Sequence, residues 1–179
     1  MHNEKERRRW QDPEAILDKI GLHAGLTFLD VGCGDGFFAI PAARLVGERG
    51  KVLAIDANHE AIDRLDKKAK REGLSNIAFR VGEAEDTILC ETCADIVFFG
   101  IVLHDFRDPL RVLKNAKVML RPSGRLVDLD WRKEPMEMGP PLEIRFSEQE
   151  AVRLIKSAGF EVESVKESGQ YHYLIIGKP

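Results

Sequence analysis

The chain has 179 residues, 44% of them apolar, which is enough to bury the hydrophobic core of one domain of ordinary size. Its formal net charge of −3 gives no strong nucleic-acid signal and no general attraction to an anionic membrane. A small-molecule partner is therefore favoured over a nucleic acid or a membrane.

No segment resembles an export signal or a membrane-spanning helix. Residues 1–10 are highly charged, and no long apolar run follows them. The apolar stretch "ADIVFFGIVLHDF" is interrupted by His104 and Asp105 well before it could span a bilayer. We therefore expect a cytoplasmic protein.

The three cysteines are Cys33, Cys90 and Cys93, and an odd number of cysteines suits a reducing compartment with free thiols. Cys90 and Cys93 form a C-x-x-C pair, but no second pair of ligands has a matching spacing. We expect no metal site. The pair precedes the fourth predicted strand, so it should lie at the edge of the sheet opposite to a ligand site.

Helical and strand-like segments alternate along the chain. A first short helix is expected behind an Asp12 cap, with Pro13 in its first turn. Later helices are expected behind caps at Asn58, at Asp108 and at a capping box of Ser147 and Glu150. Residues 121–124, "RPSG", are expected to end the helix that starts after Asp108. Five runs predict strands: TFLDVG, KVLAID, IAFRVG, DIVFFGIV and RLVDLDW. The first is expected to be buried, and the fourth is apolar on both faces, as a central parallel strand should be.

The last twenty residues contain two extended runs, separated by Gly169 and Gln170. Two strands joined so briefly cannot be parallel, so the seventh strand must run antiparallel to the sixth. The whole order predicts an α/β fold, a three-layer doubly wound sheet of seven mostly parallel strands with an antiparallel last strand. We expect a single domain over residues 1–179.

Three glycines, Gly32, Gly34 and Gly36, form the first strand-to-helix turn, and Asp30 and Asp35 lie beside them. Sheets of this kind bind ligands at that edge, where glycines let a ligand lie directly on the backbone. The two carboxylates would repel a pyrophosphate and attract a cationic ligand. The third glycine also comes one residue too early for a dinucleotide motif, which argues against a dehydrogenase that uses NAD.

Asp56 ends the second predicted strand, twenty residues after Gly36. A carboxylate at this place can accept hydrogen bonds from both hydroxyls of a ribose. Its alternative role, as cap of the next helix, is already filled by Asn58. A nucleoside joined to a cationic amino acid indicates S-adenosylmethionine.

Four segments in order carry a resemblance to a known family. "LDVGCGDG", the acidic end of "VLAID", "GEAED" and "DIVFFGIVLHDF" resemble the successive motifs of class I S-adenosylmethionine-dependent methyltransferases, with their Rossmann-like fold. The small-molecule subgroup similar to quinone-biosynthesis methyltransferases is the most alike. The resemblance covers residues 13–135, which implies a cofactor-binding core there, followed by a C-terminal helix and antiparallel strand pair in residues 136–179.

This resemblance implies a role for each matching position. It implies that Asp30, Gly32 and Gly34 hold the methionine end of the cofactor, and that Asp56 and Ala57 lie at the ribose. It implies that Glu83 and Ala84 lie at the adenine edge, where Glu83 replaces the more usual aspartate, and that the backbone of Ile101 lies beneath the sulfonium. S-Adenosylhomocysteine would be the product.

Direct transfer of a methyl group needs an aligned acceptor and, for a protonated acceptor, a base. His104 and Asp105 follow the fourth strand on the rim of the site and are the catalytic candidates, although a purely structural role is the alternative. Asp130, Trp131 and Arg132 end the fifth strand on the same rim and are candidates for the acceptor wall. The arm of residues 1–10 is flexible or lid-like, and a solvated charged tail is its simplest interpretation.

The function favoured by the sequence is methyl transfer from S-adenosylmethionine to a small-molecule acceptor. Methylation of a protein or RNA and a non-catalytic cofactor-binding module are the alternatives. No long insertion follows the fifth strand, so the pocket is expected to be open, either for a sizeable acceptor or for a homodimer whose second subunit completes the wall.

Overall fold

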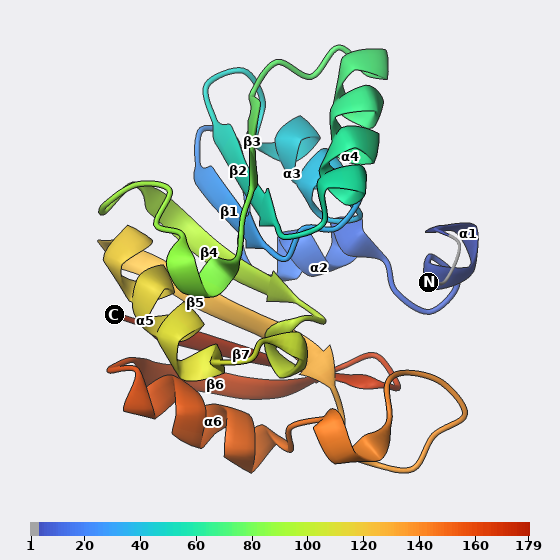
Figure 1. The fold of residues 1–179 in the computed structure, drawn as a ribbon, viewed down its shortest axis with the longest axis vertical. Coiled ribbons are helices and arrows are strands. Elements are labelled where there is room, and N and C mark those ends of the chain that lie inside the picture. The colour runs from blue at the N-terminus through green and yellow to red at the C-terminus, as the bar shows by residue number, and fades with distance from the viewer. Residues whose placement is uncertain (1–3) are drawn as a thin grey trace.

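The computed structural model describes residues 4–179 and contains one seven-stranded sheet with the strand order β3-β2-β1-β4-β5-β7-β6 (Figure 1). The strands are β1 (Thr27–Val31), β2 (Lys51–Asp56), β3 (Ile77–Val81), β4 (Ala94–Gly100), β5 (Leu120–Trp131), β6 (Glu161–Ser168) and β7 (His172–Lys178). Strands β1 to β5 pair in parallel, whereas β7 lies antiparallel between β5 and β6. The predicted fold class is confirmed.

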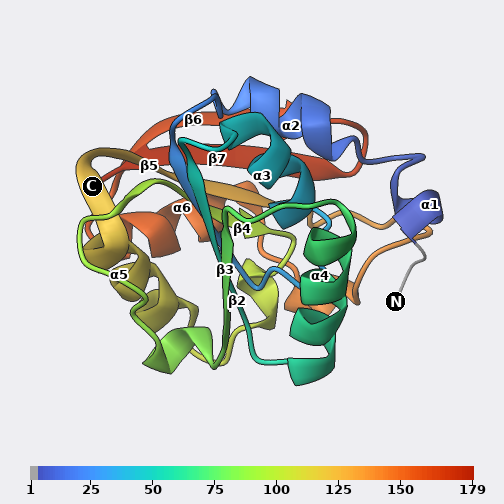
Figure 2. The ribbon, with the colours of Figure 1, turned by 90° about the horizontal axis from the view of Figure 1, so that it is seen from above.

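Helices cover both faces of the sheet (Figure 2). Helices α2 (Pro13–Lys19), α3 (Ala39–Val46) and α4 (His59–Arg71) pack on one face, and α5 (Pro109–Met119) and α6 (Glu148–Ser157) pack on the other. Side chains of a buried strand alternate between the two faces. Phe28 and Phe98 accordingly belong to the first core, and their neighbours Leu29 and Phe99 belong to the second.

The expected caps form the hydrogen bonds that their residue types allow. Asp12, Asn58 and Asp108 each accept a hydrogen bond from a backbone N–H in the first turn of the following helix. Ser147 and Glu150 form the complete capping box of α6. These local signals therefore place the helix starts correctly.

The expected end of the helix at residues 121–124 is confirmed to within two residues. Helix α5 ends at Met119, and β5 begins with Leu120. In the β4–β5 register Ala94 pairs with Leu120 and Ile96 pairs with Arg125, so residues 121–124 have no partner in β4. The segment "RPSG" is therefore an irregularity near the start of β5.

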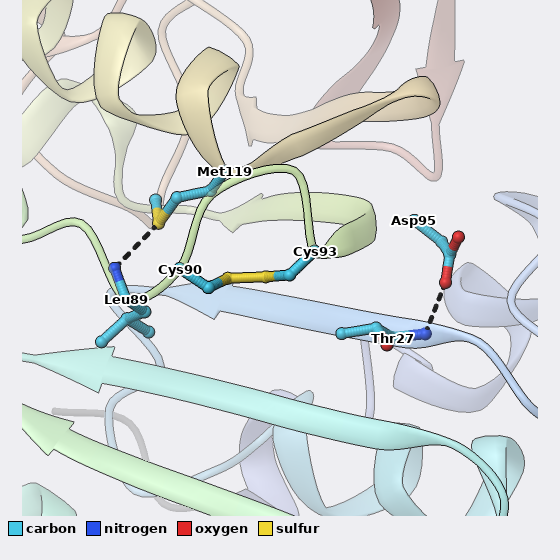
Figure 3. The surroundings of a disulfide bond; sticks show 6 residues. All are labelled: Thr27, Leu89, Cys90, Cys93, Asp95 and Met119. Carbon is cyan, nitrogen blue, oxygen red and sulfur yellow. Dashed lines mark hydrogen bonds between the residues drawn. A yellow bond between two sulfur atoms is a disulfide. The ribbon is translucent and has the colours of Figure 1, made fainter.

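The expectation of free thiols is wrong for two of the three cysteines (Figure 3). Cys90 and Cys93 form a disulfide across the bend that precedes β4, while Cys33 is free and buried. The bend brings the two Cα atoms to 6.0 Å, within the range that a disulfide spans. The pair lies beside the amino end of β4, as expected, where Asp95 accepts a hydrogen bond from Thr27 N at 2.7 Å.

Three short 3-10 helices complete the chain: η1 (Ala84–Asp86), η2 (Leu103–Asp105) and η3 (Leu142–Ile144). A first short helix, α1 (Glu4–Arg7), lies on the same side of the molecule as the loop after β5 in both ribbon views. Over the described residues 4–179, no helix is long and apolar enough to cross a membrane.

Candidate active site

A cavity of about 580 Å³ opens at the carboxyl ends of β1, β2, β4 and β5. This is the edge at which a doubly wound sheet binds its ligands. Its walls come from four parts of the chain and from the amino-terminal arm. The lining residues are Glu4, Arg7 and Trp10; Gly34, Asp35 and Phe37; Asp56, Asn58, Ala61 and Arg64; Ile101, His104 and Asp105; and Trp131, Gly139 and Pro140.

The glycine turn has a different role at each glycine. A Cβ atom at Gly34 would meet no atom within 4 Å, so this glycine leaves free space in the wall of the cavity, and its φ of 53° lies in the left-handed region. A Cβ atom at Gly32 would lie 2.5 Å from the side chain of Val102. A Cβ atom at Gly36 would lie 2.4 Å from the side chain of Leu65. Only Gly34 therefore opens the backbone to a ligand, and the other two allow close packing.

Asp56 joins the glycine turn to the start of α4. Its carboxylate accepts a hydrogen bond from Gly34 N at 2.8 Å and another from Asn58 N at 2.8 Å. A carboxylate has about four acceptor positions, so each oxygen keeps capacity for a further donor. The side chain also lines the cavity. Asp56 can therefore hold the turn and still accept hydroxyl hydrogen bonds, while Asn58 caps the helix as predicted.

Asp30 is the buried acid beneath the turn. Burial raises the pKa of its carboxyl to about 7, the charge of Arg7 opposes this shift, and the charge of Asp56 adds to it. Within residues 4–179, its Oδ2 atom is buried and has no hydrogen-bond partner. An unpaired buried carboxylate oxygen favours a cation, and the site residues thus fit a ligand that carries an ammonium group.

Ile101 follows β4 directly and has a φ of 64°. This conformation is rare for a β-branched residue and costs energy. The chain holds it there through the hydrogen bond from Ile101 N to Leu129 O at 2.7 Å. The strained residue lines the cavity, and strain of this kind clusters at functional sites.

His104 in η2 forms a hydrogen-bonded pair with Asp130 at the end of β5. Nδ1 of His104 lies 2.7 Å and 2.9 Å from the two carboxylate oxygens of Asp130. Both side chains are buried, but His104 reaches the cavity. Burial disfavours the imidazolium, yet the hydrogen bond and charge of Asp130, helped by the charge of Asp105, raise the pKa of His104 above its ordinary value.

The pair fixes which imidazole nitrogen is available. If Nδ1 carries the proton that it donates to Asp130, Nε2 is an acceptor in neutral His104. Nε2 lies 3.4 Å from a carboxylate oxygen of Asp105, which lines the cavity. Asp128, two residues before Asp130, is fully buried, and burial followed by the charge of Asp130 raises its pKa well above the ordinary value.

The three residues expected to form the acceptor wall have separate positions. Trp131 lines the cavity, although it is almost fully buried. Asp130 lies behind His104 and also accepts a hydrogen bond from Trp131 N at 2.8 Å. Arg132 points elsewhere, forming an ion pair with Glu134 at 2.7 Å. Of the three, Trp131 alone belongs to the lining of this cavity.

Three of the residues implied for the adenine and the ribose, Ala57, Glu83 and Ala84, lie at the same sheet edge but do not line the cavity. Glu83 and Ala84 follow β3, and the carbonyl of Ala84 accepts a hydrogen bond from the Asn115 side chain at 2.9 Å. Ala57 follows Asp56 directly and is exposed. The roles implied for Ala57, Glu83 and Ala84 stay predictions.

The amino-terminal arm packs against the site and is not simply a solvated tail. The guanidinium of Arg7 lies over the ring of Phe37, with 3.9 Å from Cζ to the ring centroid. Trp10 packs against Trp131 and stacks on the buried His172, with ring centroids 5.4 Å and 5.5 Å apart. The one sequence signal for this wall is the run of three arginines followed by a tryptophan in residues 7–10.

Comparison with known proteins places this geometry in a family. Residues 22–174 match a family model described as a methyltransferase domain. A solved structure of an S-adenosylmethionine-dependent methyltransferase from Aquifex aeolicus is similar at 32% sequence identity with a TM-score of 0.91. The similarity covers 99% of this chain and 98% of that chain.

Two curated relatives are similar over a shorter part. Demethylmenaquinone methyltransferase of Lactococcus lactis subsp. lactis (strain IL1403) is 32% identical over 114 residues, which are 64% of this chain and 45% of that protein. Nocamycin O-methyltransferase of Saccharothrix syringae is 32% identical over 111 residues, 62% of this chain and 40% of that protein. The match thus spans less than half the length of either relative.

Proposed function

Because the chain belongs to the methyltransferase domain family, as its motifs predicted, we propose that it transfers a methyl group from S-adenosylmethionine to a small-molecule acceptor. The observation that carries this proposal is a single cavity in which the glycine turn, with Asp56, faces the buried His104–Asp130 pair. The residues proposed to bind the methyl donor and the residue proposed to act as a base therefore line the same cavity.

The residues of the glycine turn fit the proposed donor. The unpartnered oxygen of Asp30 suits its ammonium group, the exposed backbone at Gly34 suits its amino-acid chain, and Asp56 suits its ribose hydroxyls. We extend the proposal to Gly32 at the methionine end, Ala57 at the ribose and Glu83 with Ala84 at the adenine. Bound there, the donor supplies a methyl group on a sulfonium for direct displacement. The backbone of Ile101 would lie next to it.

His104 is the proposed general base. Neutral His104 would take a proton at Nε2 from the acceptor, while Asp130 holds Nδ1–H and stabilises the imidazolium that forms. Asp105, beside Nε2, would strengthen the basicity of the ring through its charge. Asp130 is a positioning residue because it contacts His104 and does not line the cavity.

The wall of the cavity favours a largely apolar, flat acceptor with an ionisable hydroxyl. Trp10, Phe37 and Trp131 supply aromatic surface, and Ile101 and Pro140 add apolar surface. A base is useful only if the acceptor loses a proton, which a phenol or a hydroxyquinone does readily. The two curated relatives are named for small molecules, demethylmenaquinone and nocamycin.

The cytoplasmic location and the homodimer that the sequence left as an alternative also stay predictions. Cell fractionation checks the first, and sedimentation of the full chain checks the second.

The test uses donor labelled in its methyl group with a panel of small phenols and quinols, each with and without the protein. We expect label in one or more acceptors, formation of S-adenosylhomocysteine and a rise in melting temperature when S-adenosylhomocysteine is added. Label in protein or RNA would replace the proposal by macromolecular methylation. Binding without transfer to any acceptor would indicate a cofactor-binding module, and absence of binding would overturn the proposal.

A further inference from the structure

Arg7 is one of three residues of the amino-terminal arm that line the cavity, together with Glu4 and Trp10. Its Nε atom donates a hydrogen bond to the Gln11 side chain at 2.6 Å, and its guanidinium covers Phe37 in the glycine turn. Burial lowers the pKa of Arg7 to about 10, and the charges of Asp30 and Asp35 oppose this shift. Arg7 is therefore still a cation at neutral pH, and it faces the acidic side of the turn.

Two charged side chains at this place each have a buried polar atom with no hydrogen-bond partner within residues 4–179. One atom is Nη2 of Arg7, a donor, and the other is Oδ2 of Asp30, an acceptor. Leaving such atoms unpaired costs free energy in a folded protein. The two side chains interact through their charges, yet no ion pair within 4.0 Å joins them. A ligand with an anion and a cation in one group would satisfy both atoms.

The other cations near the turn already have partners. Lys68 contacts Asp35 at 2.9 Å and Glu4 at 3.1 Å. Arg8 pairs with Glu14 at 2.8 Å on the outside of the arm. Arg64, which also lines the cavity, lies 3.8 Å from Glu60, although its Nε is buried without a hydrogen-bond partner. Of these cations, Arg7 is the one whose charge acts on Asp30, and its Nη2 is buried without a hydrogen-bond partner.

We propose that Arg7 binds the carboxylate of the donor's amino-acid end while Asp30 binds its ammonium, so that the arm of residues 4–10 closes over the bound donor. This inference rests on the proposed function and adds a specificity residue outside the glycine turn. An α-amino acid carries the two complementary charges on neighbouring atoms, and a guanidinium matches a carboxylate with parallel hydrogen bonds. The arm would then bind the amino-acid end of the donor, which a simple nucleoside lacks.

Calorimetric titration of Arg7→Met tests this with two ligands that differ in the amino-acid end. S-Adenosylhomocysteine has that end, and 5′-methylthioadenosine has neither its carboxylate nor its ammonium. We expect Arg7→Met to bind S-adenosylhomocysteine at least about tenfold more weakly than wild type and to bind 5′-methylthioadenosine unchanged. Arg7→Lys keeps the positive charge but lacks the planar guanidinium that forms two parallel hydrogen bonds. Its affinity for S-adenosylhomocysteine should lie between those of wild type and Arg7→Met.

The matched control is Arg9→Met, which removes an exposed arginine from the same arm. It should bind both ligands as wild type does. Equal weakening of both ligands by Arg7→Met would mean that the substitution damages the fold of the site, and no weakening of either would overturn the inference. Failure of the wild type to bind either ligand would instead remove the proposed function. Normal binding of S-adenosylhomocysteine with a raised KM for the acceptor would assign Arg7 to the acceptor and contradict the inference.

Limited trypsin digestion supplies an independent readout of arm closure. Lys5, Arg7, Arg8 and Arg9 are cleavage sites within the arm. We expect S-adenosylhomocysteine to slow cleavage after Arg8 and Arg9, and 5′-methylthioadenosine at equal saturation to leave it unchanged. Equal protection by both ligands would contradict closure through the amino-acid end. Arg7→Met should abolish the protection by S-adenosylhomocysteine even at saturating concentration.

Discussion

The two halves of the cavity are built in different ways. The proposed donor half comes mainly from residues 30–58, a continuous segment in which one strand, one turn and the next strand follow each other. The proposed acceptor half comes from Trp10, His104, Trp131 and Pro140, which are far apart in the sequence. A local sequence can encode the first half, whereas the second exists only after the sheet and the arm have assembled.

The two halves also differ in how their polar groups are satisfied. Asp56 has two backbone N–H donors at 2.8 Å and holds the turn before any ligand arrives. His104 depends on a single buried side chain, Asp130, for its orientation and its raised pKa. We therefore expect substitutions in the first half to weaken donor binding and substitutions in the second half to slow the reaction.

We expect His104→Gln to show the largest difference between its effect on turnover and its effect on donor affinity. Loss of a general base reduces turnover by about 10²- to 10⁴-fold. Because His104 lies in the acceptor half, the affinity for S-adenosylhomocysteine should stay near that of wild type. Steady-state kinetics with calorimetry measures both. His59→Gln is the control, since His59 is exposed on the first turn of α4, and it should change neither quantity.

Asp56→Ala should have the opposite signature. The substitution leaves Gly34 N and Asn58 N without their acceptor, and it removes the proposed ribose contact. We expect donor affinity to fall by about a hundredfold, as for lost hydrogen bonds to a charged group, and the thermal shift with S-adenosylhomocysteine to disappear. Asp63→Ala, which changes an exposed acid on α4, should keep the full shift. A normal shift in Asp56→Ala would place the nucleoside elsewhere.

Asp30→Asn tests whether the buried charge of Asp30 lowers the stability of the fold while it strengthens donor binding. The pKa of Asp30 rises from 3.8 to about 7 on folding, so the folded state binds more protons than the unfolded state between these values. Stability contributed by this group therefore falls as the pH rises from about 4 to 7. At pH 8 we expect the free energy of unfolding of Asp30→Asn to exceed that of wild type by up to about 4 kcal/mol, and its affinity for S-adenosylhomocysteine to be lower. Urea titration at pH 5 and pH 8 measures the difference, which should shrink at the lower pH.

Asp130→Asn should give the smallest of the four effects, a shift in the pH profile. Only neutral His104 accepts a proton, so the rate falls as the pH drops below the pKa of His104. Asp130 raises that pKa above the ordinary 6.5, so the acid limb of kcat/KM in wild type should lie above 6.5. Replacing the carboxylate should move the acid limb to lower pH. A limb at the same pH in both proteins would show that another group titrates.

The fold was predictable because its signals are local and mutually consistent. The caps at Asp12, Asn58 and Asp108, and the capping box of α6, lie where residue type alone places them. The apolar runs of the central strands are buried in the sheet, whereas β3 at the edge of the sheet is only partly buried. Helix α5 also ends directly before the "RPSG" segment, where the turn residues place its end.

The acceptor half was predictable only in part, and the reason is physical. His104 and Trp131 follow strand ends, so their general position follows from the parallel sheet. The contact of Asp130 with His104 depends on side-chain directions across two neighbouring strands, which a sequence pattern does not contain. The same holds for Arg7, since the direction in which an arm folds back is set by Phe37, Trp131 and His172, which lie far from it in the sequence.

The most direct test is a calorimetric titration of S-adenosylhomocysteine into wild type and His104→Gln, with turnover measured on the same samples. The account predicts one binding event of similar affinity in both proteins and at least a hundredfold loss of turnover in the variant. No binding to the wild type, or a loss of affinity that matches the loss of turnover, would contradict it.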